Sequence, residues 1–218
     1  MLYDESLWFS QKIKNFKGND LSPVINLGCG DAKLRNKHQP YIQLNVLSPL
    51  AATGANVINT DMKSGDGVDV SGDIFDVLVQ EQLRSRNPKS LLCFNILEHV
   101  EDRAAFAQIC LGLLPPGGLL LVSVPNAFPY HPDPIDSLFR PDPEAVAKLF
   151  QQCDVLCSDI VKCERFFDQL WFNPRRIAGF FAHLLVPFPS MRHWKAAWLK
   201  IPYLWKRYRV TCVILRKR

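Results

Sequence analysis

Short apolar runs alternate with stretches of helical periodicity along most of the chain. The runs that predict β-strands are residues 24–27, 41–46, 57–60, 68–70, 91–95 and 119–124, with two late ones at 155–161 and 210–215. Amphipathic or capped stretches predict helices at residues 5–16, 102–114, 142–150 and 191–200. This alternation is typical of a doubly wound α/β sheet.

A glycine turn follows the first apolar run. Gly28 and Gly30 lack side chains, so the backbone can turn sharply and bring N–H groups close to a nucleotide-like ligand. A dinucleotide site would need glycine where Lys33 stands, and no Gly-Lys-Ser/Thr run of a P-loop follows. S-adenosylmethionine, which needs only the shorter turn, is a third interpretation, and an ordinary strand-to-helix turn is the fourth.

Charge is distributed unevenly along the 218 residues, whose formal net charge is +5. Eleven of the 26 Lys and Arg residues follow residue 172, whereas all 21 Asp and Glu residues precede it, which leaves a net −6 before that point. An acidic body with a basic C-terminal segment argues against a nucleic-acid-binding protein.

Cysteines and apolar segments indicate the cellular compartment. The odd number of seven scattered cysteines predicts reduced thiols in a cytoplasmic protein, and their spacing predicts no metal site. No apolar run approaches the roughly 20 residues that span a bilayer, and we expect no cleavable signal peptide.

Two aspartates stand where predicted strands end. Asp61 follows the run 57–60, and Asp73 follows the run 68–70. In open α/β sheets the carboxyl ends of strands surround the ligand, where a carboxylate can accept hydrogen bonds from ribose hydroxyls. The alternative is that each is a turn or helix-capping aspartate.

Five motifs in order resemble class I S-adenosylmethionine-dependent methyltransferases, with a Leu-Glu-His-Val run typical of the small-molecule and glycan branches. They are Asn26-Leu27-Gly28-Cys29-Gly30, Thr60-Asp61-Met62, residues 67–74, residues 95–100 and Leu114-Pro115-Pro116-Gly117-Gly118. The resemblance covers about residues 26–150, and 210–215 resembles the closing strand. It implies a Rossmann-like, mostly parallel, seven-stranded sheet whose last strand is antiparallel.

The resemblance also implies roles at the cofactor site. Gly28 and Gly30 would approach the cofactor, Asp61 would hold the ribose, and Asn95 would line the methionine side. Asp73 and Ile74 would frame the adenine, and Cys29 and Met62 belong to the same motifs.

Two departures from the family pattern affect this assignment. Asn26 stands where the family usually has an acid, so its amide would contact the cofactor's amino group. The spacer before Asp61 is long, so Asn45, at the end of the run 41–46, is an alternative second-strand residue, with Asp61 then at the adenine position. We favour Asp61 because the run from Asp61 to Asp73 matches continuously.

Candidate catalytic residues lie in the long proline-rich loop after the fifth core strand. Methyl transfer needs a base only when the acceptor loses a proton. His131 is our candidate base or acceptor-orienting residue, with Asp136 supporting it and His99 competing for the role. The alternative is that Asp133 and Asp136 form turns and His131 packs in the loop.

Aromatic and basic residues gather near the C-terminus. Trp194 and Trp198 share one face of the predicted helix 191–200, among Lys and Arg residues. This segment could lie on an anionic membrane, form a lid that selects an acidic or lipid-linked substrate, or pack on the core with a solvated basic face.

These observations predict a methyltransferase that uses S-adenosylmethionine and a small-molecule or glycan/lipid-linked acceptor. The alternative is a non-catalytic module of the same fold that acts through its basic segment. We expect an N-terminal helix (1–22), a Rossmann-like core (23–165), a basic aromatic insertion (166–208) and a closing strand (209–218). The oligomeric state and the acceptor do not follow from the sequence.

Overall fold

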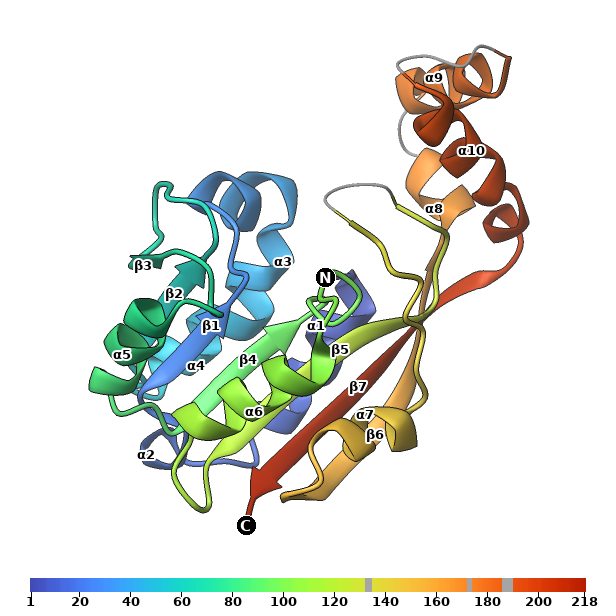
Figure 1. The fold of residues 1–218 in the computed structure, drawn as a ribbon. Coiled ribbons are helices and arrows are strands. Elements are labelled where there is room, and N and C mark those ends of the chain that lie inside the picture. The colour runs from blue at the N-terminus through green and yellow to red at the C-terminus, as the bar shows by residue number, and fades with distance from the viewer. Residues whose placement is uncertain (132–134, 172–173, 186–189) are drawn as a thin grey trace.

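The protein is built on one seven-stranded sheet. The computed structural model describes residues 1–131, 135–171, 174–185 and 190–218. Its strand order is β3-β2-β1-β4-β5-β7-β6 (Figure 1). The strands are β1 (Val24–Leu27), β2 (Val57–Asp61), β3 (Val70–Ser71), β4 (Ser90–Phe94), β5 (Leu119–Ala127), β6 (Cys153–Arg165) and β7 (Arg207–Lys217). Strand β7 is antiparallel to both neighbours, and the other pairs are parallel. The α/β doubly wound, Rossmann-like sheet with its antiparallel last strand is therefore confirmed.

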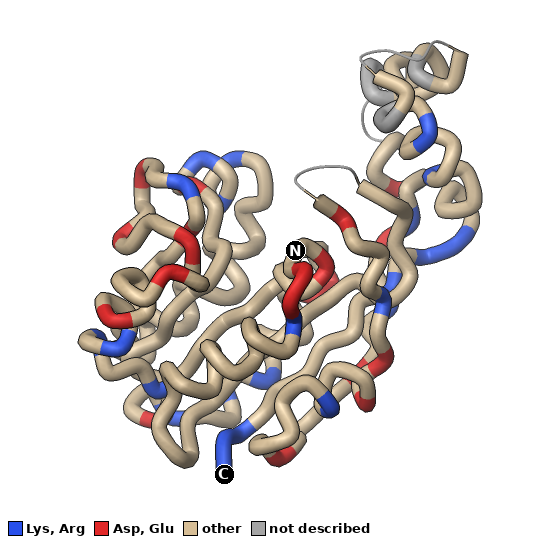
Figure 2. Tube along the Cα trace, viewed as in Figure 1, with Lys and Arg blue, Asp and Glu red and all other residues tan. Residues whose placement is uncertain are grey.

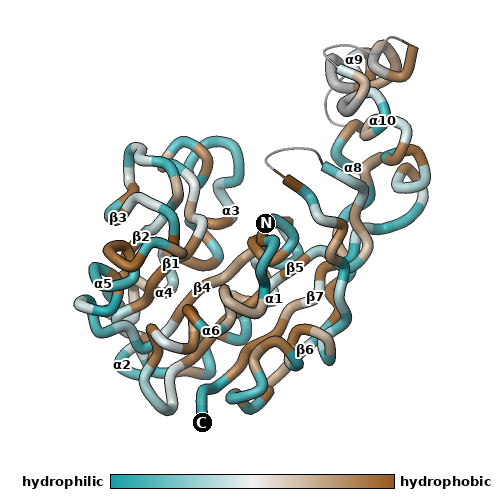
Figure 3. Tube along the Cα trace, in the orientation of Figure 1, coloured by the Kyte–Doolittle hydropathy of each residue, from teal (hydrophilic) through white to brown (hydrophobic). Residues whose placement is uncertain are grey.

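Helices cover both faces of the sheet, because alternate strand residues point to opposite sides. On one face, Leu91 and Cys93 of β4 pack with α5 (Val77–Ser85), α6 (Arg103–Leu113) and α7 (Pro143–Leu149). On the other face, Leu92 packs with the elements that precede β2 in the chain. These are α1 (Tyr3–Ile13), α2 (Gly18–Leu21), α3 (Pro40–Ile42), the π-helical turn η2 (Gln43–Leu47) and α4 (Ser48–Ala52). A second π-helical turn, η1 (Leu34–His38), precedes α3. Figure 3 shows hydrophobic residues along the central strands.

Two of the predicted helices begin at capping aspartates. Asp102 accepts a hydrogen bond from the Ala105 N–H at 2.9 Å at the start of α6. Asp142 accepts one from the Ala145 N–H at 2.8 Å at the start of α7, where proline occupies the first turn. Both aspartates satisfy N–H groups that have no partner within the helix.

The predicted strand at residues 41–46 is wrong. This segment belongs to α3 and η2, because its buried residues follow helical spacing: Val46, Leu47 and Leu50 pack into the core whereas Leu44 is exposed. Strand β1 already pairs with β2 and β4, so no further strand fits beside it. Asn45 therefore does not end a strand; its amide donates to Ser6 Oγ at 2.9 Å. The second-strand position belongs to Asp61.

A helical segment connects the far ends of β6 and β7 and projects beyond the sheet (Figure 1). It contains α8 (Phe166–Trp171), α9 (Pro174–Leu185), α10 (Met191–Leu199) and the 3₁₀ turn η3 (Ile201–Leu204). Leu170, Phe180 and Ala197 form its small apolar core. Within the described ranges, none of the helices combines the length and apolar character needed to cross a membrane.

Candidate active site

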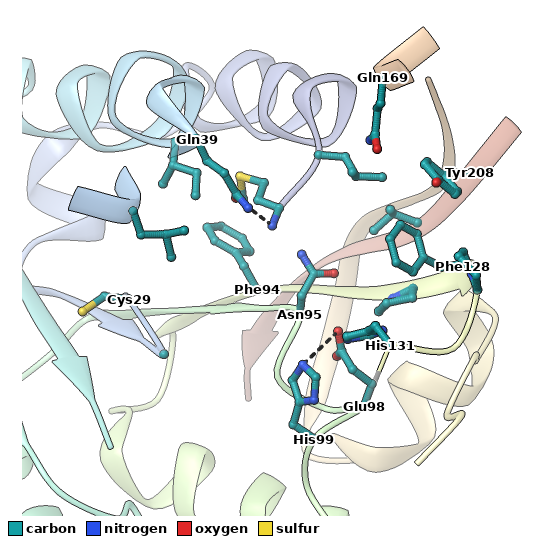
Figure 4. A pocket seen from close by; sticks show the side chains of 18 of the residues that line it. Cys29, Gln39, Phe94, Asn95, Glu98, His99, Phe128, His131, Gln169 and Tyr208 are labelled. Atoms are coloured by element: carbon teal, nitrogen blue, oxygen red, sulfur yellow. Dashed lines mark hydrogen bonds and ion pairs between the residues drawn. The ribbon is translucent and has the colours of Figure 1, made fainter. Parts of the chain in front are cut away.

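A pocket with a volume of about 560 Å³ lies at the carboxyl ends of β1, β4 and β5 (Figure 4). The core strands supply its floor, and the N-terminal residues, η1 and the projecting segment supply its walls. It is lined by Met1, Leu2, Asn26, Leu27, Gly28, Cys29, Leu34, Gln39, Ile42, Phe94, Asn95, Glu98, His99, Pro125, Phe128, Pro129, His131, Phe166, Gln169, Lys200, Tyr208 and Val210. Aromatic rings and a few polar groups thus share one cavity, which is typical of small-molecule sites.

The glycine turn is held in a left-handed conformation at one end of this pocket. Gly28 has φ 60° and Gly30 has φ 61°, a region that side-chain-bearing residues seldom occupy. A Cβ at Gly30 would overlap Leu34. Buried Arg35 donates hydrogen bonds to the carbonyl of Gly30 at 2.6 Å and to that of Gly67 at 2.7 Å. The sequence analysis missed this arginine, which ties the turn to the loop before β3.

Asp61 lies beside the turn, at the end of β2. Its Oδ2 accepts the Gly30 N–H at 2.8 Å, and its Oδ1 accepts the Lys63 N–H at 3.0 Å. The carboxylate is half-buried. It therefore fixes the backbone of the turn and remains accessible to a ligand there.

Other predicted cofactor residues divide into two groups. Asn26, Cys29 and Asn95 line the pocket together with Gly28. Gly30 and Asp61 lie outside this lining, beside Gly28 and Cys29, and so do Met62, Asp73 and Ile74, near the ends of β2 and β3. Met62 and Asp73 are exposed, and Asp73 accepts the Phe75 N–H at 2.9 Å, as a turn aspartate does.

A buried acid from the first helix holds Asn95 in place. Asn95 adopts a left-handed conformation with φ 53° after β4, and its amide donates to Glu5 Oε1 at 3.0 Å. Glu5 has no exposed surface and also accepts the Leu2 N–H at 2.8 Å. The sequence analysis missed Glu5, which stands at a helical position that by itself indicates only an N-terminal cap.

The predicted catalytic residues come together at the opposite side of the pocket. The rings of His99 and His131 are perpendicular, with centroids 5.1 Å apart. His131 Nδ1 lies 3.0 Å from Asp136 Oδ2, and Arg140 donates to both Asp136 oxygens at 3.0 and 2.6 Å. Asp133 lies outside the described residues.

Burial and pairing set the charges in this cluster. Burial lowers the pKa of His131 and therefore favours a neutral imidazole, although the nearby Asp136 acts in the opposite direction. Burial alone would raise the pKa of Asp136, but hydrogen bonds from Arg140 and two backbone N–H groups outweigh it and hold the pKa below its usual value. A neutral imidazole backed by a carboxylate can accept a proton or bind a cation.

Glu98 lies beside the two histidines, with its side chain 1% exposed. Burial raises its pKa to about 8. Its Oε1 lies 3.8 Å from His99 Nε2, and its Oε2 has no hydrogen-bond partner among the described residues. A buried polar atom without a partner is rare in folded proteins. Glu98 belongs to the Leu-Glu-His-Val run, but the sequence predicted no role for this residue.

The overall arrangement matches that of many solved structures. No protein-family model matches the chain. A protein assigned as a sarcosine dimethylglycine methyltransferase, from Galdieria sulphuraria, superimposes over 97% of this chain and 84% of its own, with a TM-score of 0.60 and 11% identity. The chain has the class I methyltransferase fold.

Further comparisons agree with this fold. Coclaurine N-methyltransferase, solved with N-methylheliamine and S-adenosylhomocysteine, matches 96% of this chain and 69% of its own, with a TM-score of 0.56 and 14% identity. An S-adenosylmethionine-dependent methyltransferase from Archaeoglobus fulgidus gives a TM-score of 0.52 at 14% identity, over 97% and 92% of the two chains.

Two curated proteins are similar in sequence. Both are ubiquinone biosynthesis O-methyltransferases, from Colwellia psychrerythraea and Cupriavidus pinatubonensis, and each is 29% identical over 117 residues. Each match covers 47% of this chain, and it spans about two fifths of the relative, 42% and 41% respectively.

Proposed function

We propose that the chain transfers a methyl group from S-adenosylmethionine to a hydroxyl oxygen of a small-molecule acceptor. The observation that carries this proposal is one pocket that joins the glycine turn after β1 to the histidine and acid cluster after β4 and β5. Donor and acceptor must be aligned roughly 3 Å apart for in-line displacement, and a single pocket with two chemically different ends permits this. The fold and the O-methyltransferase relatives support the same activity.

In this proposal the cofactor occupies the end at the glycine turn. Gly28, Cys29 and Gly30 approach it, Asp61 accepts from the ribose hydroxyls, and Asp73, Ile74 and Met62 border the adenine. Asn26 and Asn95 contact the methionine moiety; both line the pocket. The amide of Asn26 replaces the acid that the family usually carries before the turn.

The acceptor occupies the other end. His131, supported by Asp136, takes the hydroxyl proton or orients the acceptor, and His99 is the competing base. Phe94, Phe128 and Tyr208 offer aromatic surface for an apolar acceptor body. Lys200, whose pKa is lowered by burial, also lines the pocket and would attract an acidic group of a small, glycan or lipid-linked acceptor.

Thermal unfolding with S-adenosylhomocysteine tests the cofactor assignment. A ligand that binds only the folded state at about 100 times its dissociation constant adds roughly 2.7 kcal/mol of stability. We expect a shift of this size, with no comparable shift from the dinucleotide NAD. An unchanged unfolding temperature would contradict the proposed function and leave the chain a binding module that merely retains the fold.

We also propose that the projecting segment contacts anionic membranes. Leu185 is 83% exposed and Trp205 is 74% exposed, and Trp198 and Phe181 are also exposed. Figure 2 shows Lys and Arg residues along this part of the chain, where residues 173–218 contain no Asp or Glu. Exposed aromatic residues next to cations suit the interface of an anionic bilayer. Because Phe166, Gln169 and Lys200 of the same segment line the pocket, docking would bring the pocket near the lipid surface.

A further inference from the structure

Three side chains with metal-binding atoms meet at the wall of the pocket. They are Glu98, His99 and His131, and one ligand atom from each lies within 4.8 Å of the others. All three line the cavity, and Figure 4 shows them grouped on one side of it. Two imidazoles and one carboxylate are a donor set that first-row divalent cations bind, with coordination positions left over for other ligands.

Glu98 supplies an independent indication that this cluster binds a ligand. Its side chain is 1% exposed, and its Oε2 has no hydrogen-bond partner among the described residues. Leaving a buried carboxylate oxygen unpaired is costly, whereas a cation at this position would satisfy it. The unpaired oxygen belongs to a pocket-lining residue rather than to the apolar core.

One nitrogen of each histidine lies close to an oxygen of the protein. His99 Nδ1 pairs with the carbonyl oxygen of Ile135. His131 Nδ1 lies 3.0 Å from Asp136 Oδ2, and Arg140 fixes that carboxylate. Metal-binding histidines commonly donate the nitrogen that does not bind the ion to a carbonyl or carboxylate, and His99 shows this arrangement. Nε2 of His99 lies 3.8 Å from Glu98 Oε1, on the side of the cluster where a ligand would bind.

We propose that Glu98, His99 and His131 bind one divalent cation of the zinc type, which holds the oxygen of the methyl acceptor. This inference rests on the proposed methyl transfer. The acceptor O–H loses its proton to water, the resulting oxygen anion attacks the methyl carbon, and the O–CH3 bond forms as the S–CH3 bond breaks. S-adenosylhomocysteine leaves as a neutral thioether. The cation stabilises the oxygen anion, so the two histidines act as ligands and orient the acceptor.

Metal titration of the intact chain tests this site without any acceptor. Chelator-treated protein would be titrated with Co2+, followed by visible absorption, and with Zn2+, followed by calorimetry. We expect one ion per chain. His99→Ala, His131→Ala and Glu98→Gln should each weaken binding at least about tenfold, since even residues that only support ligands cost 10–100-fold. His38→Ala changes an exposed histidine outside the pocket and should bind like the wild type.

Three outcomes would overturn the proposal. The first is no binding at millimolar metal, and the second is equal binding by the wild type and the three variants. The third is a strong near-ultraviolet thiolate band with Co2+, because this band would place the ion on a cysteine such as Cys29. Circular dichroism would establish that each variant is folded. The thermal shift with S-adenosylhomocysteine would be measured on the same samples. A normal shift without metal binding contradicts the cation site alone, whereas loss of the shift in the wild type contradicts the proposed function.

Discussion

Glu5 links the first helix to the candidate active site. It is fully buried, and its carboxylate accepts hydrogen bonds from the Leu2 N–H and from the Asn95 amide. Hydrogen bonds to a charged acceptor contribute about 1.5–3 kcal/mol. The contact therefore both stabilises the fold and holds a pocket residue in a left-handed conformation.

Replacing Glu5 with Ala should weaken the fold and the pocket together. The Asn95 amide would lose its acceptor, so we expect a loss of about 1–3 kcal/mol in the free energy of unfolding. The affinity for S-adenosylhomocysteine should also fall. Urea denaturation and calorimetry measure the two effects. Glu101→Ala removes an exposed glutamate and should change neither the free energy of unfolding nor the affinity for S-adenosylhomocysteine. If Glu5→Ala also left both quantities unchanged, the buried contact would contribute nothing.

His131 is expected to act in turnover rather than in cofactor binding. It lies with His99 and Asp136 across the pocket from the glycine turn. His131→Ala should therefore abolish methyl transfer, measured as S-adenosylhomocysteine released with a hydroxylated acceptor, and should leave the thermal shift with that ligand intact. Normal turnover by this variant would contradict the role.

At the level of elements, the sequence predicted the positions of the strands well. It gave the wrong structure for residues 41–46, between β1 and β2. The apolar runs at 24–27 and 119–124 lie within real strands, and the predicted stretches 102–114 and 142–150 contain the helices α6 and α7. The run 41–46 alternates like a strand, yet it is helical because tertiary packing, not local periodicity, selects which of its apolar residues are buried. Contacts such as Arg35 with Gly67 join distant segments and leave no local signal.

The projecting segment between β6 and β7 should bind anionic vesicles. We expect co-sedimentation with vesicles that contain phosphatidylglycerol and not with pure phosphatidylcholine, and release as salt screens the charges. Trp198→Ala and Trp205→Ala should each reduce the bound fraction, because both side chains are exposed on this segment. Leu44→Ala, an exposed apolar residue on η2, serves as the control. Binding that ignores lipid charge, salt and both tryptophans would exclude this role.

At the scale of the whole molecule, the strand order explains why distant motifs share one pocket. Strands β1, β4 and β5 are adjacent and parallel, so the residues after them meet at one edge of the sheet. Asn26, Asn95 and His131 are therefore neighbours around a cavity although more than a hundred positions separate the first and last. The motif order could predict this convergence, whereas the burial of Glu5 and Glu98 depends on how the helices and loops pack over that edge.

The central claim is that a methyl donor occupies the glycine turn beside Asp61. Calorimetric titration of S-adenosylhomocysteine into the wild type, Asp61→Ala and the exposed control Asp20→Ala tests it most directly. We expect one site per chain in the wild type and in the control. In Asp61→Ala, the loss of about 1.5–3 kcal/mol in charged hydrogen bonds predicts roughly tenfold to hundredfold weaker binding. No binding by the wild type, or equal affinities in all three proteins, would contradict the claim.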